Sequence, residues 1–181
     1  MRLLMDRVLS GVVLSLVLIV GPTAAMSQFC GEVFTIPTHN GTTTKYAVSK
    51  TTGSAGVVIA ILPGGGGFAD LDTGECAREL QGNSLVQAQQ YFHDLGFITA
   101  LIDAPSDHQA GDGLAGFRID PAHAADIGAV IVDLRKLMGL PVWLTGTSRG
   151  SISAVNTASR LTGDAAPDGL VLTSSVVQGN E

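Results

Sequence analysis

The chain has 181 residues, a length that fits one domain with or without a leader. Its residues are 45% hydrophobic and 14% charged, which is enough to build a core and excludes wholesale disorder. The 16 acidic residues outnumber the 10 basic ones, giving a net charge of −6. No stretch is rich in lysine or arginine, which argues against nucleic acid or an anionic membrane surface as a partner. The two cysteines are too few for a disulfide scaffold and too far apart in sequence for a zinc site.

Residues 1–27 have the pattern of a secretory signal peptide. Arg2 and Arg7 precede an uncharged apolar run over residues 8–20, and small residues follow it. The run is short for the hydrocarbon core of a bilayer, so an uncleaved membrane anchor is the weaker alternative. We therefore expect a mature domain from residue 28 to 181, exported to the periplasm or secreted, with no stable membrane span after signal removal.

An antiparallel hairpin is predicted next. Two strand-like runs, 34–39 and 42–48, are separated by Asn40-Gly41, and this dipeptide is a strong signal for a tight turn. Pro37 lacks a backbone donor, which suits an edge strand.

The rest of the chain alternates strands and helices. Continuous apolar runs, typical of strands buried on both faces, occupy residues 57–62, 97–102, 142–145 and 170–173. Helical patterns cover about 85–95, 121–138 and 149–161, with Asp120 placed as an N-cap and Gly139 as a stop. Such alternation predicts an α/β fold with a doubly wound, mostly parallel sheet.

The strongest motif is Gly146-Thr147-Ser148-Arg149-Gly150, which matches G-x-S-x-G between a buried strand and a helix. A strand that turns directly into a helix holds the serine in a strained conformation and leaves no room for side chains at the flanking glycines. We expect Ser148 at the carboxyl edge of the sheet, with the Arg149 N–H at a helix N-terminus. The alternative is an ordinary glycine-rich turn.

A second motif, Pro63 followed by glycines 64–67, comes directly after the first buried strand. Such a loop lets backbone N–H groups approach a ligand closely. One alternative is a flexible turn. Another is a dinucleotide-binding loop, since Gly64, Gly66 and Ala69 match G-x-G-x-x-A, but residues 70–79 do not continue as an apolar helix.

Together the turn at residues 146–150, the glycine loop and the strand order resemble the α/β-hydrolase family over residues 33–181. In that family the serine-bearing turn is called the nucleophile elbow. The segment 103–107 (Asp-Ala-Pro-Ser-Asp), taken with the elbow, is similar to a group of exported bacterial members. The resemblance implies a serine nucleophile at Ser148 and an oxyanion hole formed by the N–H groups of Gly65, Gly66 and Arg149. Lipase-like members carry a histidine before the glycines, where this chain has Pro63-Gly64.

The family's catalytic acid and histidine follow the serine in the chain, but all four histidines here precede Ser148. His108, in the loop after the fourth strand, is the one alternative base. The other three are expected at the surface: His39, His93 and, in an exposed first helical turn, His123. Both triad partners are therefore expected to be absent, as is the C-terminal part of the fold.

Asp103, at a strand end, is expected to line the pocket together with His108, or else to cap the loop that follows it. Cys30 and Cys76 are candidates for a disulfide in an oxidising compartment. A bond between them is as compatible with the sequence as two independent thiols.

The sequence thus predicts a serine hydrolase for small-molecule ester or similar acyl substrates, with no metal and no organic cofactor, and inactive as this chain alone. Two alternatives stay open: a non-catalytic exported binding protein on the same fold, and a serine peptidase. The oligomeric state is not predicted.

Overall fold

The computed structural model describes residues 31–51, 53, 55–71 and 77–177. The predicted signal peptide at residues 1–27 and both cysteines, Cys30 and Cys76, lie outside the described residues. Within the described part of the chain, no helix is long and apolar enough to cross a membrane.

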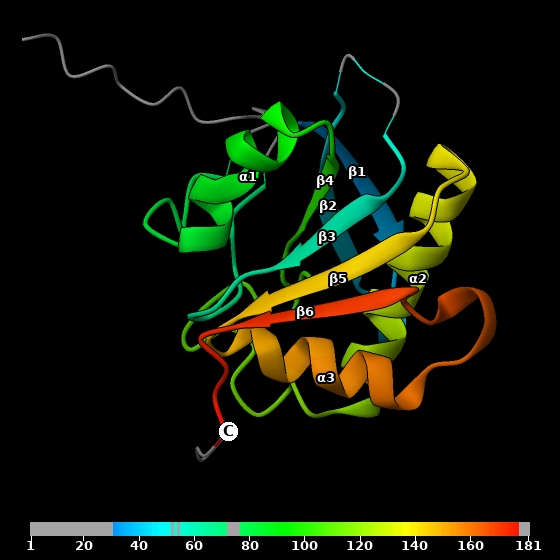
Figure 1. Cartoon of the computed structure of the whole chain (residues 1–181). Helices are drawn as coiled ribbons and strands as arrows, with labels where there is room; N and C mark the ends of the chain where they lie inside the picture. The colour runs from blue at the N-terminus through cyan, green and yellow to red at the C-terminus, as the bar shows by residue number, and fades with distance from the viewer. Residues whose placement is uncertain (1–30, 52, 54, 72–76, 178–181) are drawn as a thin grey trace, which may run out of the picture.

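A single six-stranded sheet in the order β1-β2-β4-β3-β5-β6 forms the centre of the molecule (Figure 1). Strand β1 pairs antiparallel with β2 and β2 antiparallel with β4, whereas β4, β3, β5 and β6 run parallel. The predicted doubly wound α/β fold with an N-terminal hairpin is confirmed. The strands are β1 (Glu32–Pro37), β2 (Thr43–Ser49), β3 (Val58–Leu62), β4 (Ile98–Ile102), β5 (Val142–Thr147) and β6 (Gly169–Thr173).

The hairpin turn follows from its sequence. Asn40 and Gly41 adopt positive φ values of 47° and 79°, the region that this dipeptide tolerates best, inside a short 3₁₀ helix (His39–Gly41). Because β1 is an edge strand, the missing donor of Pro37 removes no hydrogen bond from the sheet interior.

Every residue of β3 and β4 is buried, as expected for central strands covered on both faces. The opposite edge is different. Leu170, Val171 and Leu172 of β6 are each about two-fifths exposed, because this strand pairs only with β5 in the described part of the chain.

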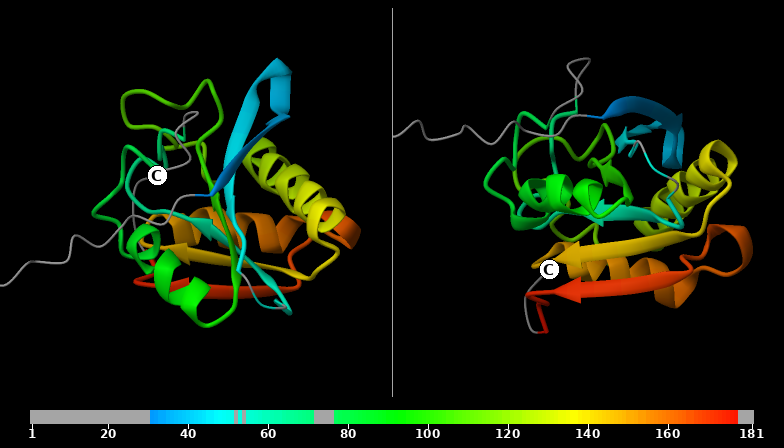
Figure 2. Two further views of the ribbon diagram at one scale, coloured as in Figure 1. Left: turned by 90° about the horizontal axis from the view of Figure 1, so that it is seen from above. Right: turned by 45° about the horizontal axis from the view of Figure 1, so that its top comes forward.

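Helix α1 (Ser84–Asp94) covers one face of the sheet, and α2 (Pro121–Met138) and α3 (Gly150–Arg160) cover the other (Figure 2). The Asn83 side chain caps α1, and the Asp120 side chain caps α2, by accepting backbone N–H bonds. Gly139 ends α2 with φ 65°. All three helices lie within a residue or two of their predicted bounds.

Alternate strand side chains fill two cores. Leu85 and Val86 of α1 pack on Ile59, Ile61 and Leu101. On the other face, four α2 residues and one from α3 pack on the inner strands: Ile127, Val130, Ile131, Leu134 and Ala154. Because β3, β4 and β5 run parallel, their carboxyl ends share one edge of the sheet, where both glycine-containing motifs lie.

Candidate active site

Ser148 lies at the turn between β5 and α3 and has φ 49°, a left-handed value that non-glycine residues rarely adopt. Hydrogen bonds on both sides hold this conformation. Its N–H donates to the Thr173 carbonyl at the end of β6 (3.1 Å), and its carbonyl accepts from the N–H (3.0 Å) and the hydroxyl (2.6 Å) of Ser151. The predicted strand-to-helix turn is therefore present, with a half-buried serine at its apex.

The two flanking glycines have no room for a side chain. A Cβ on Gly146 would lie 2.5 Å from the Gly150 carbonyl oxygen, and a Cβ on Gly150 would lie 2.1 Å from the Leu62 carbonyl oxygen. Both obstacles are backbone atoms, which cannot rotate away. The sequence pattern thus follows from how closely α3 begins against β3 and β5.

The glycine loop after β3 lies directly against the serine. A Cβ on Gly64 would be 2.9 Å from the Ser148 Cβ and 3.5 Å from its Oγ. The contact arises because β3 and β5 are adjacent and parallel, with Leu62 opposite Gly146 in the register. Two segments more than eighty residues apart therefore meet at one point on the sheet edge.

Three of the four glycine carbonyl groups of the loop accept hydrogen bonds within the protein. Gly64 O accepts from the Gly67 N–H (3.2 Å), Gly66 O from the Leu114 N–H (2.9 Å), and Gly65 O from the Arg118 guanidinium (3.0 Å). In a trans peptide the N–H points opposite to the C=O. Among the described residues, no protein group accepts from the Gly65 or Gly66 N–H, so these two predicted oxyanion donors are available.

Arg149 immediately precedes α3 with helical backbone angles, so its N–H belongs to the first turn, where the helix dipole is positive. Its side chain forms an ion pair with Asp112 (3.2 Å), which lies in the long loop between β4 and α2. This side-chain contact was not predicted from the sequence, because its partner lies 37 residues away.

Arg118, at the end of that same long loop, was also missed. It is 1% exposed, and its guanidinium donates to the Gly65 carbonyl, to the Ser153 hydroxyl (2.8 Å) and, at 3.5 Å, to the Pro63 carbonyl. Nothing in the local sequence signalled burial, because its partners lie 35 to 55 residues away. By binding the Pro63 and Gly65 carbonyls, the Arg118 side chain holds the backbone of the glycine loop in place.

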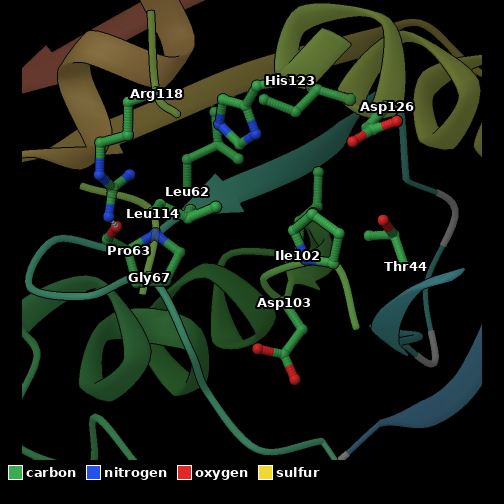
Figure 3. Close-up of a pocket in the computed structure, with 12 residues that line it drawn as sticks. Thr44, Leu62, Pro63, Gly67, Ile102, Asp103, Leu114, Arg118, His123 and Asp126 are labelled. Atoms are coloured by element: carbon green, nitrogen blue, oxygen red, sulfur yellow. Dashed lines mark hydrogen bonds between the residues drawn. The ribbon is translucent and has the colours of Figure 1, made fainter. Parts of the chain in front are cut away.

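A small cavity lies beneath the loop, with Arg118, His123 and Asp103 among its lining residues (Figure 3). Its volume of about 10 Å³ is room for roughly one water molecule, so it is not a substrate pocket.

Asp103 lines this cavity, but its carboxylate is occupied by the backbone. It accepts from the N–H groups of Ala69 (2.6 Å), Leu71 (2.9 Å) and Ala104 (2.8 Å). Burial raises the pKa of this carboxyl, and the three hydrogen bonds oppose the rise. Asp103 therefore anchors mainly the segment that continues the glycine loop. Of the loop that follows Asp103 itself, which the sequence left open for capping, it binds only the first N–H, that of Ala104.

His123 was expected to be exposed, and this prediction was wrong. It is 3% exposed, because the first turn of α2 packs against α3, where its Nε2 meets the Ser153 hydroxyl at 2.8 Å. Burial lowers the pKa of His123 to about 3, helped by the nearby charge of Arg118. A neutral imidazole leaves the Ser153 hydroxyl free to donate to it while accepting from Arg118.

The other three histidines have partners of their own. His39 was expected at the surface, but its side chain is 11% exposed and lies between Asp126 and Asp107. Burial by itself lowers the pKa of His39, but the hydrogen bonds and negative charges of the two carboxylates raise it by more, so the pKa is raised overall. His108 stacks on Phe117 at 4.1 Å, and His93, half-buried on α1, contacts the Lys50 carbonyl. Within the described residues, Ser148 makes no hydrogen bond to any histidine.

Comparison with known proteins identifies the fold. No protein-family model and no curated protein matches the sequence, but solved structures share the fold over part of their length. A cold-adapted esterase from an Arctic intertidal metagenomic library aligns with TM-score 0.56 and 17% identity over 77% of this chain and 58% of its own. An α/β serine hydrolase without a lid from Xanthomonas campestris gives 0.52 and 19%, over 78% and 59% of the two chains. Brefeldin A esterase, a bacterial homologue of human hormone-sensitive lipase, gives 0.52 and 21%, over 88% and 42%.

The chain therefore has an α/β-hydrolase fold, as the sequence resemblance implied. It spans roughly half the length of these solved structures and forms part of the fold that they share.

Proposed function

We propose that this chain carries the nucleophile half of a serine hydrolase for ester or similar acyl substrates, with Ser148 as nucleophile. The left-handed backbone of Ser148 carries the proposal, because strain of this kind at a non-glycine residue concentrates at functional sites. A plain glycine-rich turn would have no need to hold a serine there with three hydrogen bonds.

The negative charge that forms on the substrate carbonyl oxygen would lie next to backbone N–H donors. In acyl transfer the serine oxygen attacks the carbonyl carbon, and the carbonyl oxygen becomes an oxyanion that needs N–H groups aimed at it. The Gly65 and Gly66 amides face away from their bonded carbonyls, and Gly64 lies against Ser148. Together with the Arg149 N–H at the start of α3, they supply the oxyanion hole in this proposal.

A base must take the serine proton and pass it to the leaving alcohol, after which water hydrolyses the acyl–enzyme to the acid. No described histidine bonds to Ser148, and His108 is engaged with Gly113 and Phe117. We therefore propose that the acid and the histidine come from outside these 181 residues. The leader predicted at residues 1–27 adds export to the proposal.

Hydrolysis of a small activated ester, p-nitrophenyl acetate, tests this. We expect little turnover by the 181-residue chain, since an oxyanion hole without a base retains only about 10³–10⁴-fold over water. A longer polypeptide that carries an acid and a histidine after residue 181 should be active and should react with a fluorophosphonate at Ser148. Both signals should vanish in Ser148→Ala and persist in Ser159→Ala, an exposed serine on α3.

Other outcomes separate the alternatives. No ester turnover and no labelling in either form would favour a binding protein, and turnover of amides in preference to esters would favour a peptidase. Robust hydrolysis by the 181-residue chain, abolished by Ser148→Ala, would overturn the assignment of an external base and make His108 the candidate.

A further inference from the structure

Two histidines and an aspartate from distant parts of the sequence meet beside the hairpin turn. His39 lies in that turn, and Asp107 and His108 lie in the loop after β4. They meet because β2 pairs with β4 and the pairing continues past the strand end, where Ser106 and Thr43 exchange hydrogen bonds. None of these three side chains hydrogen-bonds to Ser148.

We infer that His39 Nε2, Asp107 Oδ2 and His108 Nε2 form a binding site for a divalent transition-metal ion, with Zn²⁺ as its best-matched occupant. The inference is independent of the proposed hydrolase function. It departs from the sequence analysis, which predicted no metal.

Distances between the donor atoms fit one shared ion. His39 Nε2 lies 3.1 Å and His108 Nε2 3.9 Å from Asp107 Oδ2, and all three atoms lie within 4.8 Å of one another. Ligand bonds of about 2.0–2.2 Å in a tetrahedral site place donor atoms roughly 3.3–3.5 Å apart. Small side-chain rotations therefore suffice to bring all three onto a single centre.

Each imidazole is also oriented for metal binding by its other nitrogen. His39 Nδ1 lies 2.6 Å from the Asp126 carboxylate, and His108 Nδ1 lies 3.2 Å from the Gly113 carbonyl. Both partners accept in these contacts, so Nδ1 carries a hydrogen in each ring and Nε2 is turned towards Asp107. His39 Nε2 hydrogen-bonds to Asp107 Oδ2 in the ion-free protein, and a bound metal ion would replace the proton shared between them. Donation of the second ring N–H to a carboxylate or a carbonyl is the usual outer arrangement of metal-bound histidines.

The surroundings hold the rings in place and leave the ion access. Phe117 stacks on His108 (4.1 Å) and contacts the ring of His39 (4.9 Å), so neither imidazole rotates freely. The buried Asp126 also accepts the His39 backbone N–H (2.9 Å). Asp107 is 44% exposed, which gives an ion a route from solvent.

Ligand chemistry selects the metal. Two imidazoles and one carboxylate suit Zn²⁺ and other first-row divalent ions, whereas Mg²⁺ and Ca²⁺ prefer oxygen donors. Three protein ligands leave one position for solvent. An ion bound here ties the hairpin turn to the loop after β4, so binding should also raise the thermal stability of the chain.

Zn²⁺ titration of the chelator-treated chain, purified without a histidine tag, tests the inference. Calorimetry should give one ion per chain, with affinity at least tenfold weaker in His108→Ala and in Asp107→Asn. Both residues are partly exposed, so these variants should stay folded, as far-ultraviolet circular dichroism would check. His93→Ala, which removes a histidine elsewhere, is the matched control and should bind like the unmodified chain.

Two further readouts complete the test. Co²⁺ should give visible d–d absorption of a tetrahedral site in the chain and in His93→Ala, and not in the two site variants. The cysteines are competing ligands, so the titration is repeated with Cys30→Ser and Cys76→Ser combined. Absence of Zn²⁺ binding, unchanged affinity in both site variants, or loss of binding with the cysteines would each overturn the inference.

Discussion

His123 should make the stability of this protein unusually sensitive to mild acid. The native state keeps its imidazole neutral, because burial lowers the pKa to about 3, whereas in the unfolded chain the pKa returns to 6.5. Between these values the unfolded state binds a proton that the native state does not. The free energy of unfolding therefore falls as the pH drops through 6.5 and continues to fall towards 3.

The size of the effect follows from the two pKa values. At pH 7.5 the unfolded imidazole is mostly neutral and the contribution of His123 is close to zero. At pH 4.5 it is almost fully protonated, so acidification between these two values should cost about 2–3 kcal/mol. His39 acts in the other direction: its raised pKa stabilises the native state below the folded value, and that stabilisation is lost as the pH rises through it.

Comparison with His123→Gln isolates the contribution, because glutamine does not titrate and can still bond to Ser153. Urea unfolding, followed by circular dichroism and by fluorescence of the single Trp143, should show the unmodified chain losing about 2–3 kcal/mol more than the variant between pH 7.5 and 4.5. His93→Gln controls for the loss of one histidine elsewhere. Parallel pH dependence in the unmodified chain and His123→Gln would refute the reasoning.

Other changes test the geometry around Ser148 by urea unfolding. Gly150→Ala should cost about 1–3 kcal/mol because its Cβ meets the Leu62 carbonyl, whereas Gly82→Ala, with open space around it, should change little; equal costs would contradict this. Asp103→Asn keeps one acceptor oxygen for three N–H groups and should cost about 1–3 kcal/mol; an unchanged midpoint would argue against its anchoring role. Arg118→Met takes the guanidinium donor away from the Ser153 hydroxyl and the Gly65 carbonyl and should cost about 2–4 kcal/mol, which a stable variant would disprove.

Local signals made most of the fold predictable. Uninterrupted apolar runs indicated β3 and β4, because both faces of these strands are covered. Asp120 and Gly139 indicated the ends of α2, because each forms its capping hydrogen bond with backbone only a few residues away. The elbow was predictable for the same reason: a strand, a tight turn and a helix lie within a few residues of Ser148.

Long-range polar contacts were not predictable. Arg118 and His123 carry polar side chains that gave no sign of burial, yet both are buried and hydrogen-bond to Ser153 of α3, which follows them by 35 and 30 residues. The His39–Asp107 contact joins residues 68 positions apart through the pairing of β2 with β4. Hydrophobic periodicity says nothing of such contacts, because it reports which face of an element is covered and not which polar groups meet there.

The glycine loop shows why these hidden contacts matter for the site. Glycines 64–67 have no side chains to bury, so apolar packing cannot fix where their N–H groups point. Their orientation is set instead by what binds the carbonyls on the other side, and Leu114 and Arg118 both do so from the loop after β4. A site that needs N–H groups aimed in one direction must bind the attached carbonyls in the other. The residues behind the loop are therefore as much a condition of an oxyanion hole as the amides that would form it.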